Sequence, residues 1–445
     1  MDFQNEREKG QRTMTLTRNE IMPGVFLNCV TTEKFKTGCL SISLLSQLCR
    51  ETAAMNALIP HVLRRGTRRF PEMEQLSGEL DRLYGVGIAP AVRKIGEIQA
   101  VGLVADFVDG PYVPDFEGLF HDTVRLTCEV LLDPCLENGL LSRQHVESEK
   151  RQQLDQLRSR INDKRSYSLQ RIIELMCCYE DFAVSRRGDE ETTEAVTSEA
   201  LTEQYRKLLE TSPVEIFYCG SYPYEHVEAL LLEQLKDLPR GEIDFDIGTD
   251  IRMNAVEEPP RYFEEELAVT QGKLSIGFRL GEVMEDPDYA ALYVMNALYG
   301  GCVTSKLFMN VREKLSLCYY ASSMVDVSKG LLLVYSGIDF DKYDAAQKEI
   351  FAQLIAVKNG DFTDDELLFA KRSIADALRA TMDSQTDLEH YWLTRNLRGE
   401  EYDPVEFSEL VERVTREDVI RAASTLVCDG IYFLKGNGEA EEDEA

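Results

Sequence analysis

The chain alternates between strand-like and helix-like hydrophobic patterns. Residues 38–48 alternate apolar and polar side chains like a half-buried strand, and the apolar run at 53–59 that follows predicts a helix. Residues 86–107 predict a β-hairpin, and residues 142–178 carry the pattern of one long amphipathic helix. A further strand, 214–220, ends in glycine.

The stretch 239–261 has no sustained period. It contains several prolines and many charges, which is typical of an inter-domain linker. After it the order restarts, with a strand at 267–278, a helix at 287–299, strands within 317–338 and helices within 341–397. A last helix begins at Thr415, whose spacing to Asp418 predicts a capping box.

The two halves close alike. A helix from Leu201 leads to the strand 214–220, and the helix from Thr415 leads to 430–436. This predicts two copies of one α+β unit, each within the usual size of a domain. We expect an N-terminal domain at 1–240, a linker at 241–260 and a C-terminal domain at 261–445, of which 439–445 form a solvated acidic tail.

Composition indicates a globular protein without a nucleic-acid partner. The chain has 445 residues, 44% of them hydrophobic, and a formal net charge of −30, which disfavours nucleic acids and anionic membrane surfaces. The polar N-terminus lacks a signal-peptide pattern and no window is apolar enough to span a membrane. The 11 cysteines show no C-x-x-C spacing, which favours reduced thiols and a cytoplasmic location.

The most informative short motif is His61-Val62-Leu63-Arg64-Arg65, at the end of the first predicted helix. A helical His-x-x-Glu-His sequence presents two zinc ligands and a general base on one face. Here the glutamate position holds Arg64 and the second histidine position holds Arg65. A guanidinium about 5 Å from a divalent cation, at an effective dielectric of roughly 20, is repelled by on the order of 6 kcal/mol. The motif therefore predicts no bound metal and no cofactor; by itself, a lone histidine beside arginines is more typical of an ordinary structural helix.

A second constellation lies at 299–320. Walker spacing is absent there, so a phosphate-binding loop is rejected. A Gly-Gly turn and a Ser-x-Leu-Phe helix lead to Arg312 and, seven residues later, Tyr319. This segment resembles the second-domain signature of the M16 (insulinase/pitrilysin-like) peptidase family, with Tyr320 as the motif tyrosine if the register is shifted by one.

The resemblance extends over nearly the whole chain and implies a fold. Members have two homologous domains, each a mixed, mainly antiparallel sheet with helices packed on it, which enclose a chamber. It also implies roles for the first motif: His61 matches the first zinc ligand, Arg64 the base and Arg65 the second ligand. The distal ligand position, seven residues after Glu149, holds Gln156. On this alignment three of the four chemical positions are lost, so the chain is expected to lack peptidase activity of its own.

The retained pair implies a binding role. Arginine and tyrosine suit a peptide carbonyl or a developing oxyanion, and in the family such a pair holds peptide bound as an extra strand at a sheet edge. Residues 162–167 and the degenerate motif resemble a YmfF-type bacterial subgroup, whose members are thought to pair with a zinc-bearing YmfH-type relative. The resemblance thus implies a non-catalytic subunit of a heteromeric metallopeptidase. The alternatives are a scaffold protein with no peptide-binding role and a zinc enzyme with relocated ligands.

Two weaker candidates remain. His145, Glu147 and Glu149 place metal-ligating groups on one predicted helix, where a solvated charged face is the simpler interpretation. The arginines at 64, 65, 68 and 69 could hold an anion or an acidic partner, and we favour internal pairing with Glu72, Glu74 or Glu79.

Overall fold

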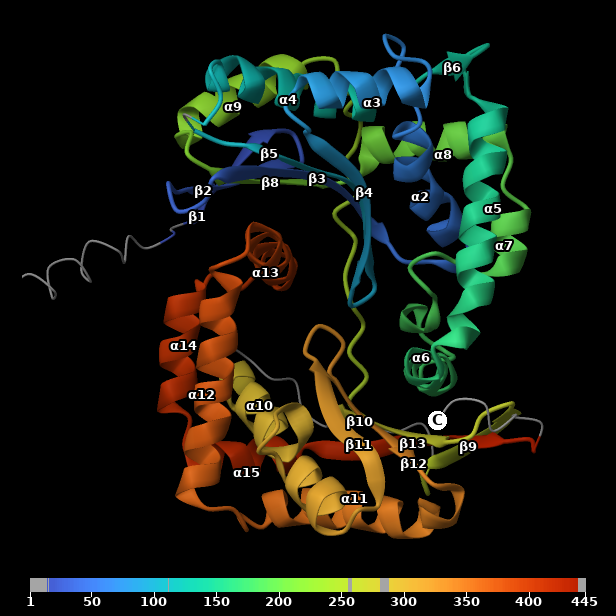
Figure 1. Ribbon diagram of the computed structural model, residues 1–445, viewed down its shortest axis with the longest axis vertical. Helices are drawn as coiled ribbons and strands as arrows, with labels where there is room; N and C mark the ends of the chain where they lie inside the picture. The colour runs from blue at the N-terminus through green and yellow to red at the C-terminus, as the bar shows by residue number, and fades with distance from the viewer. Residues whose placement is uncertain (1–13, 15, 111, 255–257, 281–287, 439–445) are drawn as a thin grey trace, which may run out of the picture. The chain divides into compact units, whose positions relative to one another are not determined.

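The computed structural model describes residues 14, 16–110, 112–254, 258–280 and 288–438 (Figure 1). The chain forms two compact units, each assembled from three segments. Unit 1 comprises Met1–Leu154, Arg186–Ile247 and Ser384–Leu397, and unit 2 comprises Asp155–Ser185, Gly248–Asp383 and Arg398–Ala445. These units differ from the contiguous domains expected from the sequence, because 155–185 and 384–397 each belong to the unit formed mostly by the other half of the chain.

Unit 1 is built on a 6-stranded sheet with the order β1-β2-β8-β3-β5-β4. Neighbouring strands are antiparallel except β2 and β8, which are parallel. The strands are β1 Leu16–Met22, β2 Val25–Thr31, β3 Thr37–Gln47, β4 Gly87–Ile95, β5 Ile98–Val108 and β8 Val214–Gly220, and a separate short ribbon pairs β6 Leu136–Glu137 with β7 Leu140–Leu141.

Helices cover both faces of this sheet (Figure 1). The helix α13 lies on the face opposite α4 and α9, and its Glu389 accepts a 2.9 Å hydrogen bond from Ser41 Oγ of β3. This explains why β3 is buried on both faces and not half-buried as its alternation predicted: its polar Ser41 faces α13 and not solvent. The helices are α2 Arg50–Leu63, α3 Met73–Arg82, α4 Phe116–Leu132, α5 Arg143–Ser159, α7 Glu190–Glu194, α8 Ser198–Thr211, α9 Tyr224–Gln234 and α13 Gln385–Arg398.

Unit 2 repeats this topology in a 5-stranded sheet with the order β11-β12-β10-β13-β9. Again one pair, β13 with β9, is parallel and the others are antiparallel. The strand that closes each half, β8 or β13, lies between a parallel and an antiparallel neighbour, so the expected duplication of an α+β unit with a mixed, mainly antiparallel sheet is confirmed. The strands are β9 Arg261–Leu267, β10 Gly272–Leu280, β11 Cys318–Asp326, β12 Leu331–Ile338 and β13 Leu426–Gly436.

The helices of unit 2 include two segments wound as π-helix, η3 and η4, around the Gly300-Gly301 turn. π-Helical turns are rare and often mark functional sites. The helical elements are α6 Lys164–Met176, α10 Asp288–Asn296, η3 Ala297–Gly301, η4 Leu307–Lys314, α11 Tyr343–Lys358, α12 Asp364–Thr381, α14 Pro404–Arg413 and α15 Arg416–Ser424, with short 3-10 turns η1 Arg160–Asn162, η2 Asp181–Ala183 and η5 Phe340–Lys342.

Two predicted elements differ from those observed. The long helix expected at 142–178 is interrupted, because Asp163 leaves helical geometry and its side chain caps the start of α6 by accepting from the backbone of Arg165 and Ser166. The strand expected at 267–278 begins at Gly272, since 261–267 form the separate strand β9. The capping box at Thr415 is confirmed. The acidic tail at 439–445 lies outside the described residues.

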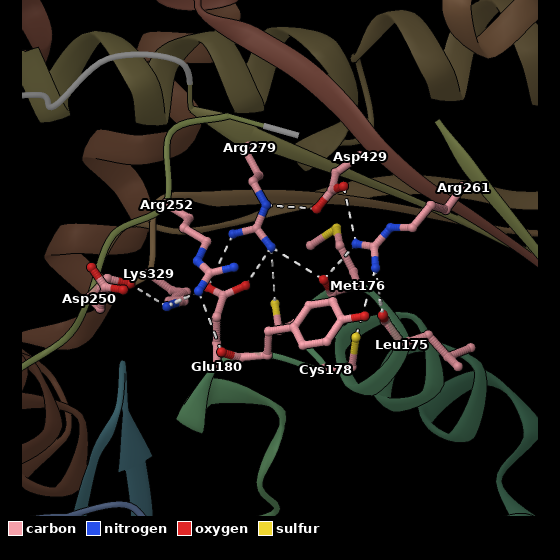
Figure 2. Close-up of polar contacts among 12 residues, drawn as sticks. Leu175, Met176, Cys178, Glu180, Asp250, Arg252, Arg261, Arg279, Lys329 and Asp429 are labelled. Atoms are coloured by element: carbon pink, nitrogen blue, oxygen red, sulfur yellow. Dashed lines mark hydrogen bonds and ion pairs between the residues drawn. The ribbon is translucent and has the colours of Figure 1, made fainter. Parts of the chain in front are cut away.

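A buried ionic network fixes the end of α6 to the sheet of unit 2 (Figure 2). Glu180 lies 2.6 Å from Arg279 of β10 and 2.8 Å from Lys329, and Arg279 also contacts Asp429 of β13 at 2.7 Å. The side chains of these residues are at most 2% exposed. Arg261 of β9 joins the network through Asp429 at 3.1 Å and the carbonyl of Met176 at 2.7 Å. Charges buried this deeply require close partners, and each of these has them.

Candidate functional site

His61 stands in the last turn of α2 and is half-buried. Its Nε2 lies 3.4 Å from Nη1 of Arg187, and since arginine can only donate, Nε2 accepts. Burial and, second, the charge of Arg187 lower the pKa of His61, while Glu149 opposes this shift. His61 is therefore a neutral imidazole whose Nε2 lone pair is directed at a cationic side chain.

Arg65, at the position of the second zinc ligand, forms an ion pair through Nε with Glu149 on α5. Its Nη2 donates to Ser148 Oγ at 3.0 Å, and the carboxylate of Glu149 is 7% exposed. A nearly buried carboxylate needs a cation or several donors. Arg65 supplies that cation.

Arg64, at the position of the general base, also has a structural contact. Its Nε donates to the carbonyl oxygen of Ile88 at 2.6 Å, and burial lowers the pKa of Arg64. Ile88 lies on β4, an edge strand of the unit 1 sheet. The side chain of Arg64 therefore holds the backbone of β4.

Glu149 and Gln156, the two residues of α5 considered for the distal ligand position, have different surroundings. Gln156 is exposed and lies in the part of α5 assigned to unit 2, whereas Glu149 faces Arg65. The alignment placed the distal ligand at 156; the contact identifies Glu149 as the carboxylate that accompanies the degenerate motif.

The remaining arginines of the basic cluster pair internally, but not with the residues expected. Arg68 contacts Asp133 at 2.7 Å and Arg69 contacts Glu129 at 2.7 Å, both at the end of α4. The expected partners Glu72, Glu74 and Glu79 were close in sequence, whereas the loop after α2 packs against α4. On α5, Glu147 pairs with Lys150 at 3.4 Å. Across the described residues, no group of three or more His, Cys, Asp or Glu side chains is arranged to hold a metal.

Arg312 projects from the π-helical segment η4 of unit 2. Its guanidinium lies over the ring of Phe308, 4.6 Å from the centroid, and it contacts the carboxylate of the adjacent Glu313 at 3.6 Å. The side chain is 41% exposed. Burial raises the pKa of the Cys318 thiol, and Arg312 is among the groups that oppose this rise, which places the guanidinium near the start of β11.

Tyr319 lies at that start, on an edge strand of the sheet. The register between β11 and β12 shifts between Cys318 and Tyr320, so Tyr319 is the extra residue of a β-bulge. Bulges redirect side chains; Tyr319 is 60% exposed and its hydroxyl donates to Asp339 at 3.1 Å. This hydrogen bond raises the pKa of Tyr319. Tyr320 instead is partly buried, with its ring beneath the guanidinium of Arg165 at 4.8 Å.

The family model described as "Peptidase M16 inactive domain" matches residues 195–374. The Bacillus subtilis (strain 168) protein "Probable inactive metalloprotease YmfF" is 33% identical over 415 residues, which cover 93% of this chain and 96% of that protein. The chain belongs to the M16 peptidase family. It is a non-catalytic M16 homologue.

The chain is also similar to a solved structure and to a second Bacillus subtilis protein. A conserved protein from Enterococcus faecalis V583 has the same fold, with a TM-score of 0.86 at 25% identity, covering 96% of this chain and 100% of that one. "Uncharacterized zinc protease YmxG" of Bacillus subtilis (strain 168) is 30% identical over 135 residues, or 28% of this chain and 32% of that protein. In the described part of the chain, no helix is both long and apolar enough to cross a membrane.

Proposed function

We propose that this M16 homologue is the substrate-binding subunit of a heteromeric metallopeptidase and that Arg312 and Tyr319 contact the peptide. The observation that carries the proposal is the contrast between the two motifs. Arg64, Arg65 and His61 are half-buried and held by internal contacts, whereas the side chain of Arg312 is 41% exposed and Tyr319, at the start of an edge strand, is 60% exposed.

The chemistry of the pair suits a peptide backbone. An exposed guanidinium can donate two parallel hydrogen bonds to a carbonyl or carboxylate, and a tyrosine hydroxyl can donate to an oxygen on which negative charge develops. An edge strand has unpaired backbone groups to which an extended peptide can add. The partner subunit would supply zinc, and a zinc-bearing M16 relative of the YmfH type fits that role.

The test is reconstitution with such a partner. The chain is co-expressed with a zinc-bearing M16 protein that carries His-x-x-Glu-His, and hydrolysis of a fluorogenic peptide is measured for the purified complex. Arg312→Ala and Tyr319→Phe should each lower kcat/KM by on the order of 10²-fold, the usual effect of losing one oxyanion donor. Complex formation, followed by gel filtration, should be unchanged.

Matched variants control for this result. Tyr320→Phe removes the hydroxyl of the neighbouring tyrosine, and Arg379→Ala removes an exposed arginine that pairs with Asp376 on α12; both should retain full activity. Wild-type rates in Arg312→Ala and Tyr319→Phe would contradict the proposal and favour the scaffold alternative, in which the protein assembles a complex without touching peptide. A loss confined to Tyr320→Phe would shift the motif register by one residue.

A further inference from the structure

Two histidines that belong to neither motif meet on the surface of unit 1. His121 of α4 and His226 of α9 are 105 residues apart in the sequence, and their Nε2 atoms lie 3.3 Å apart. The rings are 5.3 Å apart between centroids and inclined at 68°. His121 is exposed and His226 is partly exposed, so solvent and ions reach the pair.

The spacing of the two nitrogens matches metal coordination. Zinc binds imidazole nitrogen at about 2.0–2.1 Å, which puts two nitrogens of a tetrahedral set roughly 3.3 Å apart. Imidazole suits Zn²⁺, Ni²⁺ and Cu²⁺ among the divalent metals. We propose that His121 and His226 form a binding site for a divalent transition-metal ion that bridges α4 and α9, with water completing the coordination.

Aromatic stacking holds the two rings in place. The ring of His226 stacks on Tyr222 with centroids 5.0 Å apart and planes at 20°, and Tyr222 stacks on the buried Phe120 at 4.2 Å and 14°. The hydroxyl of Tyr222 donates to the carbonyl of Phe116 at 3.2 Å. The ligands therefore need little ordering on binding, which lowers the entropic cost of capturing an ion.

The charges around the pair favour a cation. Glu117 precedes His121 by one helical turn and is exposed, and neither it nor Glu225, next to His226, forms an ion pair within the described part of the chain. The neighbouring cations are neutralised, because Asp122 pairs with Arg82 at 3.4 Å and with Arg125 at 2.7 Å. Residues one turn apart on a helix are neighbours, so Glu117 can approach an ion bound at His121.

This site is distinct from the degenerate zinc motif. The Nε2 of His61, on α2, accepts from Arg187, whereas the Nε2 atoms of His121 and His226 approach each other. The inference is also independent of the proposed peptidase role, since it concerns other residues.

Metal titration of the whole chain tests the site. The protein is stripped with a chelator, and Zn²⁺ or Co²⁺ is added in a calorimeter and in an absorption cuvette. One ion per chain should bind with a micromolar dissociation constant, and Co²⁺ should show the visible bands of a nitrogen-ligated site. His121→Ala and His226→Ala should each weaken binding at least tenfold, while His61→Ala and His145→Ala should bind like the wild type.

Far-UV circular dichroism and the melting temperature without metal verify that the variants fold. Both substitutions are at the surface, so these should match the wild type. Absence of a stoichiometric site in the wild type, or unchanged affinity in both His121→Ala and His226→Ala, would overturn the proposal.

Discussion

At the residue scale, Arg65 and Glu149 form a salt bridge close to His61. Glu149 remains nearly buried, and Arg65 provides the charge that neutralises it. His61 remains as well, with Arg187 at its Nε2. One histidine and one glutamate, two of the three protein ligands of a His2Glu zinc site, are thus present in unit 1, and arginines stand at positions 64 and 65.

Restoring those two residues should restore zinc binding. We expect Arg64→Glu with Arg65→His, made in a His121→Ala background to remove the surface site, to bind about one Zn²⁺ per chain. The ligands would be His61, Glu149 and the histidine introduced at position 65. The measurement is metal content by mass spectrometry after gel filtration.

Two further variants identify the distal ligand of that restored site. Adding Glu149→Gln to this variant should abolish zinc binding. Adding Gln156→Glu should leave the zinc content unchanged. A zinc content that depends on Gln156→Glu would show that the distal ligand position is 156 and not 149.

The buried carboxylate of Glu180 should control the acid stability of unit 2. Burial alone would raise its pKa, but hydrogen bonds from Arg279 and Lys329 outweigh burial and lower it. A depressed pKa contributes stability above the unfolded value, about 4.3 for glutamate, and that contribution is lost as pH falls through the folded value. The free energy of unfolding should therefore decrease as the pH falls below about 4.3, as measured by denaturant titration.

Glu180→Gln should destabilise the protein by about 3–5 kcal/mol at neutral pH, because it leaves Arg279 and Lys329 buried without this partner. It should also flatten the acid dependence. Glu191→Gln, which alters an exposed carboxylate that pairs with Arg50, is the matched control and should change stability little. An unchanged pH profile in Glu180→Gln would show that other carboxylates dominate acid unfolding.

At the element scale, two helices are exchanged between the halves of the chain. The helix α6, from the first half, lies on the sheet of unit 2, and α13, from the second half, lies on the sheet of unit 1. Ile172 and Met176 of α6 are fully buried against β10 and β13, where glycines make room: a Cβ at Gly277 would collide with Met176 Sδ. Gly277 of the second sheet therefore leaves room for α6, a helix that lies about 100 residues earlier in the sequence.

Shortening a buried side chain of α6 should lower the stability of unit 2. Ile172→Ala should cost about 2–5 kcal/mol, the usual range for a buried isoleucine. Hydrogen exchange should then quicken in β10 and β13, while β3 and β5 of unit 1 keep their protection. Ile161→Ala, at a position 36% exposed in the 3-10 turn before α6, serves as the control with little effect. Faster exchange confined to unit 1 would contradict this assignment.

At the scale of the whole molecule, each unit is incomplete without a segment from the other half of the chain. Unit 2 requires Asp155–Ser185, which supplies one helical face and the Glu180 of the ionic network. A fragment of residues 261–445 would expose the face that α6 covers and leave Arg279 without Glu180. Covalent continuity along the sequence is therefore a poor guide to which residues fold together.

The isolated fragment 261–445 should not fold cooperatively. We expect no sharp unfolding transition by circular dichroism, because apolar surface stays exposed and buried cations lose their partner. Co-expression with a 155–185 segment should restore the transition, and the same segment with Glu180→Gln should restore it less. A fragment that unfolds cooperatively by itself would show that the contiguous domain boundaries hold after all.

Local sequence patterns predict much of the fold and part of the candidate site. The strands β3, β5 and β8, the helix around His61 and the cap at Thr415 follow from periodicity and short-range hydrogen bonds, which act over a few residues. That residues 61–65 do not complete a His-x-x-Glu-His sequence is read directly from the side chains at 64 and 65. The resemblance pointed to Arg312 and Tyr319 for the same reason.

Only the tertiary structure decided the rest. It selected Glu149 as the partner of Arg65, placed α6 and α13 on sheets of the opposite halves, and brought His121 to His226. Each of these depends on contacts between segments roughly 80 or more residues apart, for which no local pattern exists, because packing of whole elements determines which side chains meet. The sequence by itself determined that arginines stand at positions 64 and 65; the fold determined which carbonyl and which carboxylate they contact, because those partners come from distant segments.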